Sequence, residues 1–133
     1  MATFLAKTEP SEYSIDDLMA DDYTTWNGVR HPVAVKAIQM MQPGDRVLIY
    51  HSGETAIVGE AQVISDPRID PEDAKSWQVD IRFLSRFEHP VTLREIKESG
   101  LFDEWALIRQ GRLSTMSVPN DFLVWFRAQL NRY

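Results

Sequence analysis

The architecture of this chain follows from six consecutive residues, Arg46-Val47-Leu48-Ile49-Tyr50-His51. The central Val-Leu-Ile-Tyr favours β-structure and does not alternate with polar residues, which is typical of a strand covered on both faces. Pro43-Gly44 stops the segment before this run, and Ser52-Gly53-Glu54 supplies a turn after it. The run therefore predicts the central strand of a sheet.

Other segments supply partners for this strand. Residues 56–64 alternate between two faces and follow the turn directly, which predicts a hairpin with the central strand. Residues 77–83 alternate Trp-Val-Ile-Phe with Gln-Asp-Arg, the clearest period-two pattern in the chain. Residues 2–7 and 112–118 are two further strand candidates. Five strands are expected in all.

Two short helices are expected before the central strand. Ser14 caps the first of them, whose first turn is acidic, and Ile15, Leu18 and Met19 are expected to face inward. Pro32 suits the first position of the second helix, in which apolar residues recur at helical spacing. Residues 21–31 lie between them, show no helical period and are predicted to form a loop.

Two more helices are expected in the second half of the chain. Thr92-Leu93-Arg94-Glu95 is a capping box, and Gly100 ends the short helix that it begins. Pro119 starts a terminal helix with an apolar stripe. The stripe is made by Phe122, Leu123, Phe126 and Leu130.

Short helices interspersed among strands, without successive βαβ units, indicate an α+β fold on a small, strongly curved mixed sheet. The 133 residues are 44% hydrophobic and 11% aromatic, which suits one globular domain, and no linker divides residues 1–133. Residues 66–76 are interpreted as a surface excursion between strands.

The composition excludes several kinds of site. The chain has no cysteine, so disulfides, thiolate zinc sites and cysteine nucleophiles are excluded. It shows neither an apolar run of membrane-spanning length nor a signal-peptide pattern, so a cytoplasmic protein without a membrane partner is expected. The net charge of −6 disfavours a broad basic surface for nucleic acid, but four arginines against one aspartate leave residues 105–133 net positive.

The familiar catalytic motifs are absent. His51-Ser52 ends a strand beside Glu54, yet no Gly-x-Ser-x-Gly elbow surrounds it, and neighbouring strand residues point to opposite faces. The three histidines lie in separate segments without metal-ligand spacing, so no metal is expected. Glycine-rich phosphate and dinucleotide loops are missing as well, so no cofactor is expected.

Trp26 is the best candidate for a ligand contact. It precedes Asn27-Gly28, a turn that can bring backbone close to a ligand, and Arg30 follows within reach of a phosphate. A tryptophan face can stack on a nucleobase, which contributes about 1–3 kcal/mol. A core tryptophan that fixes the loop would give the same sequence.

Four other residues have both an ordinary and a functional interpretation. Lys7, at the end of a strand, can be an ordinary exposed lysine or a ligand contact. Tyr50, in the central strand, can be a core residue with a hydrogen-bonded hydroxyl or a ligand contact. Arg109 and Arg112 flank Gly111 in the net positive segment, which is weak support for a phosphate contact.

Three segments in this order and spacing resemble the EVE domain family, a PUA-like group related to YTH domains. They are Lys7-Thr8-Glu9-Pro10-Ser11-Glu12-Tyr13-Ser14, Trp26-Asn27-Gly28-Val29-Arg30, and the run from Gly44 to Ser52. Residues 57–61 and 112–114 extend the likeness, which spans nearly the whole chain.

The resemblance implies a PUA-like curved sheet and a pocket that accepts a modified base of DNA or RNA, such as a methylated cytosine or adenine, without catalysis. It makes Trp26 the stacking wall, and it makes Arg30 and Arg112 phosphate contacts. The other pocket residues that it implies are Lys7, Ser11, Asn27, Tyr50, His51, Ser52 and Ser114.

Two other functions stay open at this stage. One is a small hydrolase that uses His51, Ser52 and Glu54. The other is a protein-interaction module with the terminal helix around Trp125 as its surface. The oligomeric state does not follow from the sequence, and a monomer is favoured.

Overall fold

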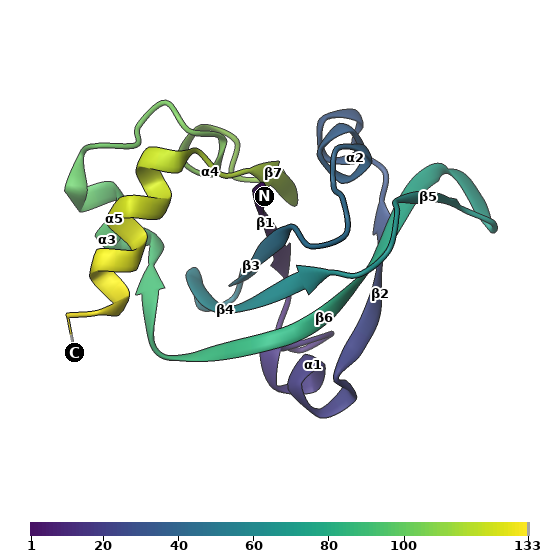
Figure 1. Ribbon diagram of the computed structural model, residues 1–133. Helices are drawn as coiled ribbons and strands as arrows, with labels where there is room; N and C mark the ends of the chain where they lie inside the picture. Colours follow the sequence, from purple (N-terminus) through teal and green to yellow (C-terminus); the bar gives the residue numbers. More distant parts are fainter. Residues whose placement is uncertain (133) are drawn as a thin grey trace.

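The computed structural model describes residues 1–132 (Figure 1). The strands are β1 Thr3–Thr8, β2 Tyr23–Val29, β3 Arg46–His51, β4 Ala56–Val63, β5 Arg68–Asp70, β6 Asp73–Thr92 and β7 Thr115–Ser117. The helices are α1 Ile15–Asp21, α2 Pro32–Gln39, α3 Leu93–Ser99, α4 Ala106–Arg109 and α5 Asn120–Leu130. The strands form one sheet in the order β2-β6-β4-β3-β1-β7, and β5 pairs with β6 outside this path.

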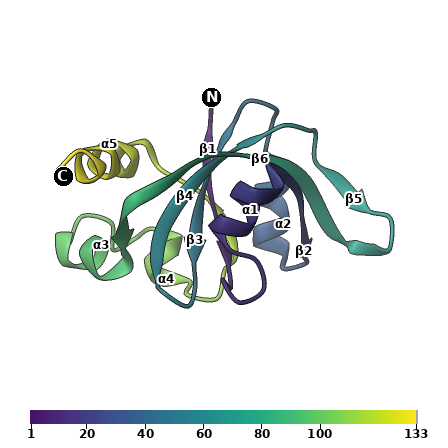
Figure 2. The same cartoon turned by 90° about the horizontal axis from the view of Figure 1, so that it is seen from below.

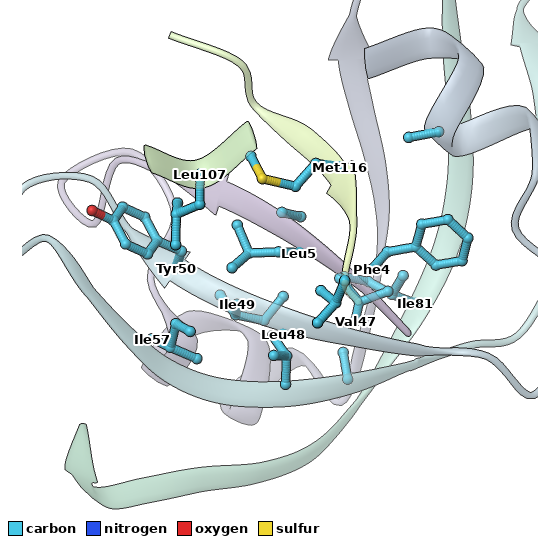
Figure 3. Close-up of a cluster of buried hydrophobic side chains, with 14 of the residues drawn as sticks. Phe4, Leu5, Val47, Leu48, Ile49, Tyr50, Ile57, Ile81, Leu107 and Met116 are labelled. Carbon is cyan, nitrogen blue, oxygen red and sulfur yellow. The ribbon is translucent and has the colours of Figure 1, made fainter. Parts of the chain in front are cut away.

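The predicted central strand is confirmed. β3 lies between β1, to which it is parallel, and β4, to which it is antiparallel. Residues 47–51 are all buried, as a strand covered on both faces requires. Figure 3 shows Val47, Leu48 and Ile49 of β3 packed with Leu5 of β1 and Met116 of β7 in the core.

The curvature comes from the long strand β6 and its neighbour β4. Their pairing shifts register between Ile57 and Gly59 and again between Glu60 and Ala61, and such bulges bend and twist a sheet. Figure 2 shows the result, an arch of strands. The expected class, a small curved mixed sheet flanked by short helices, is confirmed.

The prediction of a loop over residues 21–31 is wrong, because residues 23–29 form β2, which is antiparallel to β6. Tyr-Thr-Thr-Trp at residues 23–26 favours β-structure, and β6 supplies the backbone partners that decide the outcome. The strand expected at residues 77–83 is the middle of the longer β6, and the excursion at residues 66–76 contains β5. The strand expected at residues 112–118 is shortened to β7, and α4 was not predicted.

The helices begin and end close to the predicted residues. The hydroxyl of Ser14 caps α1 by accepting from the Asp17 N–H at 3.1 Å, and Gly100 ends α3 with a left-handed backbone. The expectation that Met19 faces inward is wrong, because it is 48% exposed while Ile15 and Leu18 fill the core. In Figure 1, α1 and α2 lie on opposite sides of the sheet.

The terminal helix α5 packs its apolar stripe into the molecule. Phe122 and Phe126 are fully buried, and Trp125 meets Phe102 edge to face with ring centroids 5.6 Å apart. The guanidinium of Arg127 donates to both carboxylate oxygens of buried Glu60 in β4, at 2.9 and 3.2 Å. The stripe that suggested a partner surface is therefore largely used within the fold.

No helix within residues 1–132 combines the length and the apolar character needed to cross a bilayer.

Candidate functional site

An open cavity of about 480 Å³ lies between the end of β1, the turn that follows it, and β2. Such a volume is within the range of small-molecule sites. The cavity is lined by Lys7, Thr8, Glu9, Glu12, Tyr13, Thr24, Thr25, Trp26, Asn27, Gly28, Val29 and Ser114. Residues 7–13, residues 24–29 and Ser114 therefore meet at one cavity, although β2 stands at one end of the strand order and β1 and β7 stand at the other.

Trp26 forms part of one wall, on a strand rather than in the irregular loop expected for it. Trp26 and Thr24 are partly buried, whereas Tyr23 and Thr25 are exposed, as period-two alternation on β2 requires. Trp26 packs against the core and still borders the cavity. The core interpretation and the ligand interpretation of this residue are therefore compatible.

A bulge shapes the end of β2 beside Trp26. The register with β6 shifts between Trp26 and Val29, and Gly28 has a φ of +76°, which side chains other than glycine adopt rarely. This backbone path places Asn27 and Gly28 on the cavity. Asn27-Gly28 was predicted to form a turn within a loop, and it forms a bulge within β2 instead.

The exposed face of β2 is tied to β6 by Asp80. The Thr25 hydroxyl donates to Asp80 Oδ1 at 2.8 Å, and Arg68 of β5 donates to the same oxygen at 2.9 Å. The hydrogen bond from Arg68 holds the pKa of Asp80 below its ordinary 3.8, against the opposing effect of burial. The strand that carries Trp26 is thus fixed by an ionised carboxylate.

Lys7 brings a positive charge to the cavity. Its backbone N–H donates to Ser114 O at 2.8 Å, and its ammonium donates to Gly111 O at 2.9 Å and lies 5.5 Å from the ring centre of Tyr50. Burial lowers the pKa of Lys7 from 10.5. Within residues 1–132 no carboxylate forms an ion pair with this ammonium, which has two further N–H groups to donate.

Two carboxylates line the cavity near Lys7. Glu9 Oε1 accepts from the Ser11 N–H at 3.4 Å and from the Ser11 hydroxyl at 3.3 Å. The Ser52 hydroxyl lies 3.4 Å from Glu9 Oε2 and 3.2 Å from Thr8 O. These contacts are long and their donors neutral, so the Glu9 carboxylate is held in place while keeping capacity to accept stronger hydrogen bonds.

Tyr13 lines the cavity on the side of α1. Its hydroxyl donates to Asp21 Oδ2 at 2.9 Å. Burial, and then this hydrogen bond, raise the pKa of Tyr13 above 10.0, so the phenol is protonated at neutral pH.

His51 and Tyr50 do not line the cavity, and His51 borders a separate small pocket beside Ile15 and Glu54. His51 Nε2 accepts from the Ile15 N–H at 3.0 Å, and Nδ1 lies 2.7 Å from Glu54 Oε1. Both ring nitrogens are therefore engaged, and His51 orients the start of α1. Ser52 contacts Thr8 and Glu9 instead, so the structure does not bring His51 and Ser52 together as a nucleophile and base.

The two arginines expected to contact phosphate differ in their surroundings. Arg30 is exposed and its Nε lies 3.0 Å from Asp73 Oδ2, so it is paired with the start of β6. Arg112 is exposed beside Gly111, the residue whose carbonyl accepts from Lys7. In the described part of the chain, Arg112 forms no ion pair.

The structure thus divides the predicted pocket residues into three groups. Lys7, Trp26, Asn27 and Ser114 line the cavity. Ser11 and Ser52 contact Glu9 at its edge. Tyr50 and His51 stand outside the lining, where Tyr50 lies under the Lys7 ammonium and His51 accepts from the Ile15 N–H. No cluster of three potential metal ligands occurs among residues 1–132.

Sequence reasoning missed the acidic residues of the cavity. Glu9 and Glu12 belong to a segment that was singled out for its likeness to a family, but their own chemistry was not considered. Thr24 was missed because residues 21–31 were interpreted as a loop, although its alternation with Tyr23 and Thr25 was the available signal.

These features define a curved-sheet α+β domain with an open, aromatic-walled cavity between β2 and the end of β1. The sequence pattern of the EVE domain family matches residues 2–127. The chain belongs to the EVE domain family, and the resemblance seen in its sequence is confirmed.

Known relatives agree with this assignment. The chain is 29% identical to thymocyte nuclear protein 1 of Gallus gallus across 71% of this chain and 51% of that protein, so it spans about half the length of this curated relative. A solved structure from Rhodopseudomonas palustris is 34% identical with a TM-score of 0.88, covering 100% of this chain and 97% of that one. Human THYN1, solved in complex with DNA containing 5-methylcytosine, is 20% identical with a TM-score of 0.90, covering 100% and 99% of the two chains.

Proposed function

We propose that this chain is a nucleic-acid-binding module without catalytic activity, and that one unpaired or flipped base enters the cavity and stacks on Trp26. The observation that carries the proposal is a partly buried indole bordering an open cavity of about 480 Å³. The complex of human THYN1 with DNA containing 5-methylcytosine supports it, since the two chains share a fold.

Two cations at one side of the cavity can serve the phosphates of a nucleotide, while Glu9 and Glu12 line the cavity itself. Lys7 and Arg112 form no ion pairs in residues 1–132 and lie together at the Gly111 turn, where they can meet one or two phosphates. Stacking of one base contributes about 1–3 kcal/mol, so few phosphate contacts are needed. This mode of binding is compatible with a net charge of −6.

A second large cavity is a poorer site for nucleic acid. It has a volume of about 520 Å³ and lies beside α3 and α4, and its lining includes Asp103, Glu104 and Asp121 but no lysine or arginine. Glu104 is paired with Arg109 at 2.6 Å, but Asp103 and Asp121 form no ion pair among residues 1–132, and such carboxylates repel a phosphate chain. The Trp26 cavity is therefore the proposed site.

A methylated base gains from an apolar recess. Burying one methyl group contributes about 0.8 kcal/mol, which is about fourfold in affinity. Packing alone therefore gives modest preference for 5-methylcytosine over cytosine, and stronger selection requires polar contacts to the base edge.

The test is a titration of short single-stranded DNA carrying one 5-methylcytosine, with binding followed by fluorescence anisotropy. Trp26→Ala is expected to weaken binding by about 10- to 100-fold because it removes the stacking surface. Tyr23→Ala is the matched control, since Tyr23 is an aromatic residue on the same strand, 63% exposed on the opposite face, and its loss should leave binding unchanged. Equal affinities for Trp26→Ala and the unaltered chain would refute the proposal.

A further inference from the structure

We propose that Glu9 selects a base with an exocyclic amino group, of the cytosine or adenine kind, and rejects thymine and uracil. The inference rests on the proposed function, because it assigns a reading residue to the same cavity. It concerns Glu9, a residue of the cavity lining whose carboxylate contacts Ser11 and Ser52 at the edge of the cavity.

The Glu9 carboxylate is placed and available. Ser11 and Ser52 contact its two oxygens at 3.3 to 3.4 Å, and no cation pairs with it among residues 1–132. An added Cβ on Gly53 would lie 3.3 Å from Glu9 Oε1, so the carboxylate also lies close to the turn between β3 and β4. An ionised carboxylate only accepts hydrogen bonds and has about four acceptor positions. The neutral donors of Ser11 and Ser52 form long contacts with it, so acceptor capacity remains for a ligand.

Glu12 is less suited to this role. Its carboxylate also lines the cavity, but it forms no hydrogen bond or ion pair with other residues of the described chain. An unanchored glutamate loses side-chain freedom when it binds, which weakens its net contribution. Glu9 is already held by its neighbours, so we assign the contact to Glu9.

The chemistry of the base edge explains why a carboxylate discriminates. Cytosine carries an N4 amino group that donates, whereas thymine carries an O4 carbonyl that accepts at the same position. A carboxylate facing N4 gains a charge-assisted hydrogen bond, and a carboxylate facing O4 meets a second acceptor and repels it. Adenine offers the equivalent N6 amino group.

This contact solves a problem that stacking leaves open. 5-Methylcytosine and thymine carry the same ring methyl group and nearly the same shape, so Trp26 and an apolar recess do not separate them. The difference lies at the amino or carbonyl group, where Glu9 would act. The two free N–H groups of Lys7 supply donors for acceptor atoms elsewhere on the base edge.

The experiment compares three short single-stranded DNAs that differ at one central position, 5-methylcytosine, cytosine or thymine. We expect the unaltered chain to bind 5-methylcytosine about 10- to 100-fold more tightly than thymine. Glu9→Gln should bring this ratio close to one, because a neutral amide can rotate to present either its oxygen or its NH₂. Glu72→Gln, the same charge change in the turn between β5 and β6, should keep the full ratio.

Each outcome separates the inference from the proposed function. Equal binding of 5-methylcytosine and thymine by the unaltered chain would overturn the role of Glu9 and leave base binding intact. If Glu12→Gln, rather than Glu9→Gln, equalised the two, the assignment to Glu9 would be overturned. Absence of binding to all three DNAs would overturn the proposed function and this inference with it. A thermal melt verifies that Glu9→Gln, at an exposed position, folds normally.

Discussion

Lys7 is the residue of the cavity that we expect to contact a charged ligand. Folding removes part of the water around the Lys7 ammonium, which lowers its pKa. The ammonium contacts the Gly111 carbonyl and the face of the Tyr50 ring in place of that water, and it has no carboxylate partner within residues 1–132. A partly desolvated cation without a counter-ion gains more from a phosphate or a base oxygen than a fully hydrated one does. Lys7 is therefore expected to contribute to affinity beyond its formal charge.

The corresponding prediction concerns pH. The bound state needs the ammonium charged, so affinity should be constant below the folded pKa of Lys7 and fall as the pH rises through it, below the 10.5 of an ordinary lysine. Lys7→Met keeps the aliphatic chain and should bind about 10-fold more weakly, without this alkaline decline. The measurement is a pH series of titrations with DNA made of cytosine, 5-methylcytosine and adenine, whose bases stay neutral there. An identical decline in Lys7→Met would contradict the prediction.

Individual site residues were partly predictable from the sequence. Lys7, Trp26, Asn27 and Ser114 were predicted for the pocket and do line the cavity. His51 was not predictable in its actual role, because its partner, the Ile15 N–H, lies 36 residues earlier and is brought to it only by the packing of α1 against the sheet. Long-range contacts of this kind leave no local periodicity in the sequence.

At the scale of elements, helix α1 packs directly against Gly59 of strand β4. A Cβ built on Gly59 of β4 would lie 2.5 Å from Ile15 Cδ1 and 2.7 Å from the backbone oxygen of Ser85 in β6. Close approach of helix and strand at this point fixes α1, and the turn before α1 carries Glu9, Glu12 and Tyr13 into the cavity. The position of the cavity wall therefore depends on a residue outside it.

We accordingly expect Gly59→Ala to lower the free energy of unfolding by about 1–3 kcal/mol, because a backbone oxygen cannot move aside as a flexible side chain does. Gly111→Ala is the control, since nothing lies within 4 Å of an added Cβ there. Urea denaturation at neutral pH measures the free energy of unfolding of both variants. If Gly59→Ala is as stable as the unaltered chain, α1 shifts to accommodate the added methyl group and the prediction is contradicted.

The elements themselves were predictable wherever their signal was local. The buried run at residues 46–51 and the Ser14 and Thr92 caps led to β3, α1 and α3. The strand β2 was missed because its pattern is short and broken by the Asn27-Gly28 bulge, so its pairing with β6 decides its structure. Pairing between distant strands outweighs weak local propensity.

At the scale of the whole molecule, one long strand connects two regions. β6 pairs with β2 beside the Trp26 cavity and then continues past α3 and α5, which lie together at the other end in both views (Figures 1 and 2). Of the four tryptophans, Trp105 and Trp125 belong to that other end, where they pack with Phe122. Tryptophans at both ends of the molecule can therefore report which end a ligand touches.

The most direct test of base stacking is an NMR titration that follows the four indole N–H signals as DNA carrying one 5-methylcytosine is added. Stacking predicts a large shift for Trp26, with nuclear Overhauser effects between its ring and the base methyl group, while Trp105 and Trp125 stay unchanged. A shift confined to Trp105 and Trp125, with Trp26 unaffected by bound DNA, would contradict it.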